Sequence, residues 1–134
     1  MSSANEVLIV DASAVVDLLI DASAADAIRA RLRQNELHAP AHLDVEVLSA
    51  IGRLHRGGLL SAKQVTQRLE IFRRLPIRRH LLDPLLAAAW EYRHDLRLTD
   101  ALYAALSDQV GMPIVTTDRG LVAAVPQADL PTAP

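Results

Sequence analysis

The chain has 134 residues, 51% apolar and 22% charged, with a formal net charge of −2 at pH 7, which fits one folded domain with an ordinary core and excludes a disordered protein. The absence of cysteine excludes disulfides and thiolate metal sites. Because there is no signal peptide and no apolar run long enough to cross a bilayer, we expect a cytoplasmic protein that makes no membrane contact.

The predicted elements begin with a buried strand. Residues 7–10, VLIV, form a short apolar run typical of such a strand. Ser23 and Asp26 form a variant of the capping box, which predicts a helix start, and Ile28 follows at helical spacing. Residues 37–40 predict a second strand, so a helical segment separates the first two strands.

Two helices come next. From Leu43 onward, apolar residues recur at helical spacing until Gly57 ends the helix. Ser61 and Gln64 form a capping box for the following helix, which we expect to run to about Arg74.

The second half of the chain repeats the alternation. Residues 75–79 predict a third strand. Asp83, followed by proline, predicts a helix with an acidic N-cap, and Thr99 is predicted to cap a further helix that Gly111 ends. Residues 113–118 predict a fourth strand.

The chain closes with a short helix at 121–125 and a tail, 126–134, in which we expect one edge strand followed by disorder. Strands that alternate with helices predict an α/β fold, with a central parallel sheet of about four to five strands and helices on both faces. We expect a single domain over residues 1–134, with its core at 7–125.

Several carboxylates fall at the ends of these elements. Asp11 follows the first strand directly, and Asp118 closes the fourth strand segment. Because ligands of open parallel sheets bind beyond the carboxyl ends of the strands, we expect these two acids to meet at one sheet edge. Asp100, in the first turn of its helix, can face the same edge. Glu46 flanks the buried face of the helix that contains it.

Each acid also has a purely structural explanation. Asp11 and Asp118 could be helix N-caps, Asp100 could complement a helix dipole, and Glu46 could be a solvated helix residue. Together, however, carboxylates within about 4–6 Å repel one another by about 1–4 kcal/mol per pair. We expect no basic partner for Asp11 or Asp100, and only Arg119 for Asp118. A hard divalent cation, Mg²⁺ or Mn²⁺, therefore fits the cluster best.

The acids lie in four sequence blocks, VLIVDASAVVDLL, DVEVLSAI, LRLTDALYAAL and PIVTTDRGL. In order and spacing these blocks resemble those of PIN-domain ribonucleases, most of all the VapC toxins of bacterial toxin–antitoxin pairs, over residues 7–125. The resemblance implies a PIN-type endoribonuclease that hydrolyses RNA phosphodiester bonds with Mg²⁺. It also implies a cognate antitoxin as partner and a homodimer or a hetero-oligomer with that antitoxin. A catalytically silent PIN-fold domain that binds RNA or a partner without cleavage is the alternative.

The resemblance also implies roles for single residues. The acidic quartet of the family is matched by Asp11, Glu46, Asp100 and Asp118. Asp11 and Asp100 are expected to contact the metal most directly, Asp118 directly or through water, and Glu46 to position water. Ser13 and Thr117 match hydroxyl positions that support the site.

A basic cluster lies outside the four blocks. We define this basic cluster as Arg73, Arg74, Arg78 and Arg79. Guanidinium groups match phosphates in geometry, so the cluster could contact RNA. A charged helix end followed by a protected edge strand explains the same residues equally well.

Overall fold

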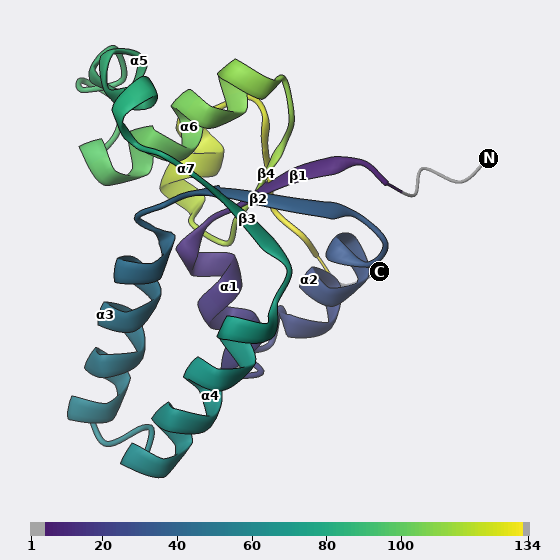
Figure 1. The fold of residues 1–134 in the computed structure, drawn as a ribbon, viewed down its shortest axis with the longest axis vertical. Helices are drawn as coiled ribbons and strands as arrows, with labels where there is room; N and C mark the ends of the chain where they lie inside the picture. The colour runs from purple at the N-terminus through teal and green to yellow at the C-terminus, as the bar shows by residue number, and fades with distance from the viewer. Residues whose placement is uncertain (1–4, 133–134) are drawn as a thin grey trace.

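A five-stranded parallel sheet forms the centre of the computed structural model, which describes residues 5–132 (Figure 1). Its strands are β1 (Val7–Val10), β2 (Glu36–Pro40), β3 (Ile77–His80), β4 (Ile114–Val115) and β5 (Ala128–Asp129). The strand order is β3-β2-β1-β4-β5, and every neighbouring pair is parallel. The predicted α/β fold with a parallel sheet is confirmed.

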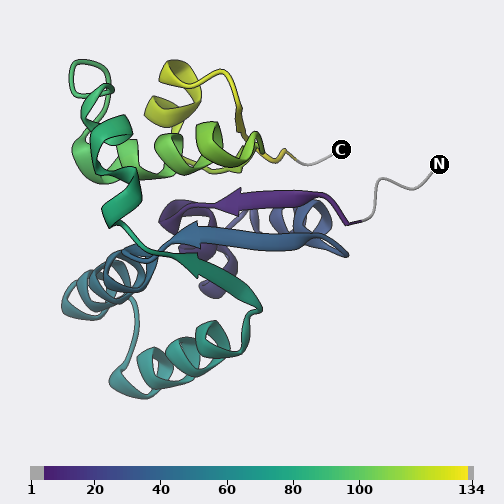
Figure 2. The ribbon, with the colours of Figure 1, turned by 45° about the horizontal axis from the view of Figure 1, so that its top comes forward.

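Helices cover both faces of the sheet. They are α1 (Ala12–Leu19), α2 (Ala25–Leu32), α3 (Leu43–Arg56), α4 (Ala62–Arg74), α5 (Leu86–Trp90), α6 (Leu98–Val110) and α7 (Arg119–Ala124), with a 3-10 turn, η1 (Asp83–Leu85), before α5. In Figure 2, α5, α6 and α7 lie above the sheet, and α3 and α4 lie below it. No helix within residues 5–132 is long and apolar enough to cross a membrane.

The two faces of β1 explain why its sequence is a continuous apolar run. Leu8 and Val10 pack into the core cluster formed with α1 to α4, whereas Ile9 packs into the cluster formed with α5, α6 and α7. All three side chains are fully buried, as expected for a central parallel strand covered on both sides. In β1, a polar side chain can therefore be placed only beyond the end of the strand, where Asp11 follows Val10.

Several local signals are confirmed. Ser61 and Gln64 form the predicted capping box at the start of α4. Gly57 caps the end of α3, and Gly111 caps α6 in the left-handed conformation, at φ 70°. The tail contains the edge strand β5. Of the segment after it, for which disorder is predicted, residues 130–132 are described and belong to no helix or strand, and residues 133–134 lie outside the described residues.

The predicted capping box at Ser23 is wrong. Helix α2 begins at Ala25, with Ala24 as its N-cap and no side-chain cap bond. Ala24 already has helical dihedral angles (φ −84°, ψ −3°), so the chain lacks the extended residue that aims a side-chain oxygen at the first amides. Asp26 instead pairs with Arg29 at 2.8 Å.

Two further helix starts differ from prediction. Asp83 opens the 3-10 turn η1 without a side-chain cap bond, and the helix that follows ends at Trp90, which is 54% exposed. Helix α6 begins one residue before Thr99, with Arg97 as N-cap and no side-chain cap bond. Thr99 is thus already inside the helix, and its carbonyl accepts a hydrogen bond from His42.

Candidate active site

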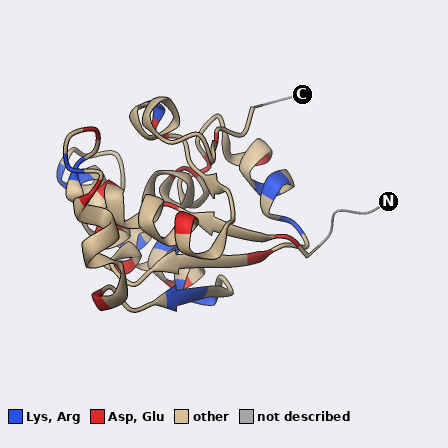
Figure 3. Ribbon diagram, turned by 90° about the horizontal axis from the view of Figure 1, so that it is seen from above, with Lys and Arg blue, Asp and Glu red and all other residues tan. Residues whose placement is uncertain are grey.

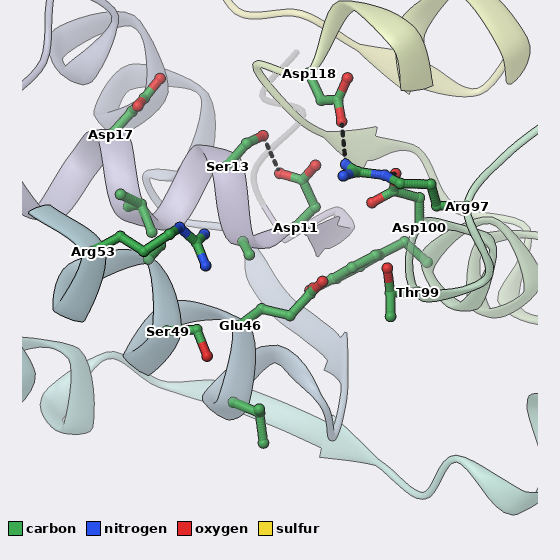
Figure 4. Close-up of a pocket in the computed structure, with 15 residues that line it drawn as sticks. Asp11, Ser13, Asp17, Glu46, Ser49, Arg53, Arg97, Thr99, Asp100 and Asp118 are labelled. Carbon is green, nitrogen blue, oxygen red and sulfur yellow. Dashed lines mark hydrogen bonds and ion pairs between the residues drawn. The ribbon is translucent and has the colours of Figure 1, made fainter.

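The four predicted acids line one pocket at the point where the sheet changes its direction of winding. β1 has β2 on one side and β4 on the other, and in open α/β sheets a crevice opens at the carboxyl ends of such strands. The acidic pocket there has a volume of about 470 Å³ (Figure 4). Its lining includes Asp11, Glu46, Asp100 and Asp118, which come from four separate segments of the chain.

Asp11 is the most deeply buried of these acids. It caps α1, with its Oδ1 accepting from the Ala14 amide at 3.0 Å and the Ser13 hydroxyl at 2.8 Å. Its Oδ2 accepts from the Thr116 hydroxyl at 2.5 Å. Burial raises the pKa of Asp11 to about 6, although these hydrogen bonds work in the opposite direction. The N-cap explanation is therefore correct for Asp11, and the same side chain also lines the pocket.

The supporting hydroxyl after β4 belongs to Thr116 and not to Thr117 as predicted. The fully buried Thr116 donates to Asp11 and accepts from the Asp118 amide at 2.9 Å. Thr117 contributes its backbone N–H, which donates to the Ser13 hydroxyl at 3.0 Å. Consecutive side chains of an extended segment point in opposite directions, so only one of the two threonines can reach Asp11.

Asp100 and Asp118 share a guanidinium group. Asp118 caps α7 by accepting two amides of its first turn through Oδ1. Arg97 Nε donates to Asp100 Oδ2 at 3.1 Å, and another nitrogen of Arg97 lies 3.9 Å from Asp118 Oδ2. The expectation that Asp100 has no basic partner, and that Arg119 is the one beside Asp118, is therefore wrong. Arg97 lies one helical turn before Asp100, and this spacing could have identified it.

Glu46 is held by a buried tyrosine that the sequence analysis missed. The hydroxyl of Tyr103, which is 1% exposed, donates to Glu46 Oε1 at 2.6 Å. Burial and the nearby Glu46 carboxylate raise the pKa of Tyr103 far above its ordinary value, so this hydroxyl remains a donor. His42 Nε2 donates to the Thr99 carbonyl at 2.8 Å and lies 3.5 Å from Glu46. Tyr103 follows Asp100 by three residues and so lies on the same face of α6. This spacing could have identified Tyr103 as a residue of the site.

The donor atoms of the pocket fit a hard divalent cation. Within residues 5–132, no group of three or more His, Asp or Glu is already arranged to hold a metal ion. Mg²⁺, however, needs only one or two carboxylates, because it retains several waters. Asp100 Oδ2 and Asp118 Oδ1 accept the hydrogen bonds described above, and no described residue donates a hydrogen bond to the second oxygen of either carboxylate. These second oxygens are therefore free to bind the cation.

The raised pKa of Asp11 predicts a pH-dependent stability when metal is removed. Between the ordinary value of 3.8 and about 6, the folded state binds more protons than the unfolded state, so the contribution of Asp11 to stability falls as pH rises through this window. Asp11→Asn lacks this dependence. In EDTA, we expect the free energy of unfolding of the variant to rise relative to that of the wild-type protein as the pH is raised from 4 to 7. The expected rise is up to about 3 kcal/mol, from about 1.4 kcal/mol per pKa unit. Urea unfolding at several pH values measures this difference, and a difference that does not change with pH contradicts the assignment.

The basic cluster lies away from the acidic pocket. Three of its members have carboxylate partners: Arg73 and Arg74 pair with Glu70, and Arg79 pairs with Asp44. β3 is an edge strand of the sheet, and its basic stretch is visible in blue in Figure 3. These contacts are those of a charged helix end and a protected edge strand. The cations that line the pocket itself are Arg53 and Arg97.

A doubly wound parallel sheet with four carboxylates at its crevice is the arrangement expected of a PIN domain, and the PIN-domain family model matches residues 8–125, which shows that class. The chain is 50% identical over 128 residues to ribonuclease VapC3 of Mycobacterium tuberculosis, covering 95% of this chain and 93% of that protein. It therefore belongs to the VapC ribonucleases of the PIN-domain family.

Two solved structures share the fold. One is VapC20 of Mycobacterium tuberculosis, a toxin that cleaves the sarcin-ricin loop, with a TM-score of 0.67, 19% identity and coverage of 87% of this chain and 94% of that one. The other is a toxin–antitoxin complex from Klebsiella pneumoniae, with a TM-score of 0.60, 14% identity and coverage of 95% and 99%.

Proposed function

We propose that this VapC ribonuclease hydrolyses RNA phosphodiester bonds in its acidic pocket and that it uses Mg²⁺, for which Mn²⁺ can substitute. Asp11 and Asp100 contact the cation most directly, Asp118 holds it directly or through water, and Glu46 positions the attacking water. The observation that carries the proposal is the convergence of these four acids, from four distant segments, on one pocket at the carboxyl ends of β1 and β4.

The protein supplies position and charge to this reaction. When bound, a divalent cation neutralises the phosphoryl oxygens and activates water. Asp11 is fixed by three hydrogen bonds, so its carboxylate is oriented before any ligand arrives. Tyr103 occupies one oxygen of Glu46 and leaves the other to accept a proton or orient water.

A cleavage assay on single-stranded RNA tests this function. EDTA should stop cleavage, and Mg²⁺ added in excess should restore it. RNA that is bound but left intact at every Mg²⁺ concentration would favour the alternative, a catalytically silent PIN-fold domain.

We extend the proposal to the cellular role and the partner. The chain acts as the toxin of a VapBC-type pair, its cognate antitoxin silences it, and the assembly is a homodimer or a hetero-oligomer with the antitoxin. The similarity in fold to a chain of a toxin–antitoxin complex supports this role. Expression of the chain alone should slow growth, and co-expression with a small antitoxin encoded beside it should restore growth. Unhindered growth without antitoxin would contradict the toxin role and leave the nuclease proposal standing.

Tyr103→Phe should lower cleavage by roughly 10-fold or more, because Glu46, which is proposed to position water, then loses the hydroxyl that orients its carboxylate. The change deletes only the hydroxyl that donates to Glu46. Single-turnover cleavage at saturating Mg²⁺ measures the effect. Tyr92→Phe is the matched control, because the Tyr92 hydroxyl donates to Asp108 outside the acidic pocket. In a Glu46→Gln background, Tyr103→Phe should have little further effect. Equal losses in both backgrounds would mean that Tyr103 does not act through Glu46.

A further inference from the structure

The acidic pocket presents an electrostatic problem for an anionic substrate. The four acids and Asp17 line it together with two guanidinium groups, so its formal charge is −3. A bound divalent cation reduces this charge only to −1. An RNA phosphate that approaches is therefore still repelled, unless positive charge lies where its neighbouring phosphates pass.

The two arginines lie on opposite sides of the acids. Figure 4 shows Arg53 on one side of the pocket and Arg97 on the other, with Asp11 and Glu46 between them. Arg53 is on α3, seven residues after Glu46, and so lies two turns further along the same helix face. Arg97 immediately precedes α6.

Both guanidinium groups are available to a phosphate. Among the described residues, Arg53 takes part in none of the ion pairs. Arg97 is paired with Asp100 and Asp118, but its own side chain is 79% exposed, so solvent screens both pairs and weakens them. It can therefore exchange these carboxylates for a phosphate once a cation occupies the acids. The planar fork of arginine binds phosphate oxygens in pairs.

We propose that Arg53 and Arg97 bind the phosphates on either side of the RNA bond that is cut, so that the strand crosses the pocket from α3 to α6. This path rests on the proposed ribonuclease function and deepens it. It assigns the principal phosphate contacts to the pocket and not to the basic cluster on β3 and α4.

The salt dependence of RNA binding tests the path. Binding of a labelled single-stranded RNA is measured by fluorescence anisotropy over a range of salt, at fixed Mg²⁺, in a Glu46→Gln background that keeps the three proposed metal ligands. Arg53→Gln and Arg97→Gln should each reduce the slope of log K against log salt by about 0.7, the value for one phosphate contact on a single strand. The loss of affinity should be similar for RNAs of different sequence, because phosphate contacts carry no sequence information.

Two control variants separate this path from general charge effects. Arg56→Gln removes a charge from the last turn of the same helix outside the pocket lining, and it should leave the slope unchanged. The double variant Arg78→Gln with Arg79→Gln should also leave it unchanged. Unchanged slopes for both Arg53→Gln and Arg97→Gln, or a reduced slope in only one of them, overturn the two-sided path. A reduced slope in the Arg78 and Arg79 double variant, with unchanged slopes in the two pocket variants, overturns it as well. Each of these outcomes leaves Mg²⁺-dependent cleavage by the wild-type protein, and hence the proposed function, unaffected.

Discussion

Asp100→Asn and Asp11→Asn should each lower Mg²⁺-dependent RNA cleavage by at least about 100-fold. Each change removes one carboxylate charge from the proposed cation site and keeps the size of the side chain. Single-turnover cleavage at a fixed Mg²⁺ concentration measures the loss. Asp100→Asn is the cleaner of the two, because Asp100 caps no helix, whereas Asp11 holds the first turn of α1.

Asp17→Asn is the matched control for these variants. Asp17 lines the same pocket from α1 but is outside the acidic quartet. It should therefore retain cleavage close to the wild-type rate. Wild-type rates in the Asp100 and Asp11 variants, or an equal loss in the Asp17 variant, would show that the quartet has no special role.

Thr116→Val should destabilise the metal-free protein by about 1–3 kcal/mol, the cost of leaving a buried polar group without its hydrogen bond. Valine keeps the shape of threonine, but it leaves Asp11 Oδ2 without this donor and the Asp118 amide without its acceptor. Urea unfolding in EDTA measures the change. Because the Thr116 hydrogen bond holds the pKa of Asp11 down, the variant should also need a higher pH to bind Mg²⁺.

Thr117→Val tests whether the effect depends on position. This threonine is only partly buried, and it supports the site through its backbone N–H, which the substitution keeps. We expect little change in stability. If the two valine variants lose the same stability, the hydroxyl of Thr116 has no particular role.

The architecture of the sheet and the convergence of the acids could be predicted from the sequence because they follow from general rules. An apolar run such as Val7–Val10 is typical of a strand covered on both faces, and alternation with helices indicates a parallel sheet. The rule that ligands bind beyond strand ends then brings Asp11 and Asp118 together. Neither inference needs a side-chain position.

Contacts between distant segments could not be predicted in this way. The hydroxyl of Tyr103 meets Glu46 across 57 residues, and Arg79 meets Asp44 across 35. Such pairs depend on how α3 packs against α6 and β3, which one sequence does not show. The choice between Thr116 and Thr117 depends in the same way on the direction of one side chain at the end of β4.

The structural and functional explanations of the acids also proved compatible. Asp11 and Asp118 are both N-caps, and both line the acidic pocket. Backbone amides hold one oxygen of each carboxylate, which fixes the side chain at a strand end. A capping aspartate is therefore oriented by the fold before a ligand binds. It also lies at the carboxyl ends of the strands, where open parallel sheets bind their ligands.

Isothermal titration of Mg²⁺ into the metal-free protein at pH 7.5 tests the central claim most directly. At this pH Asp11 is largely ionised, since its pKa is about 6. We predict saturable Mg²⁺ binding by the wild-type chain and by Asp17→Asn, and loss of that binding in the double variant Asp11→Asn with Asp100→Asn. Equal Mg²⁺ binding by the wild-type protein and the double variant would contradict the assignment of the acidic pocket as the cation site.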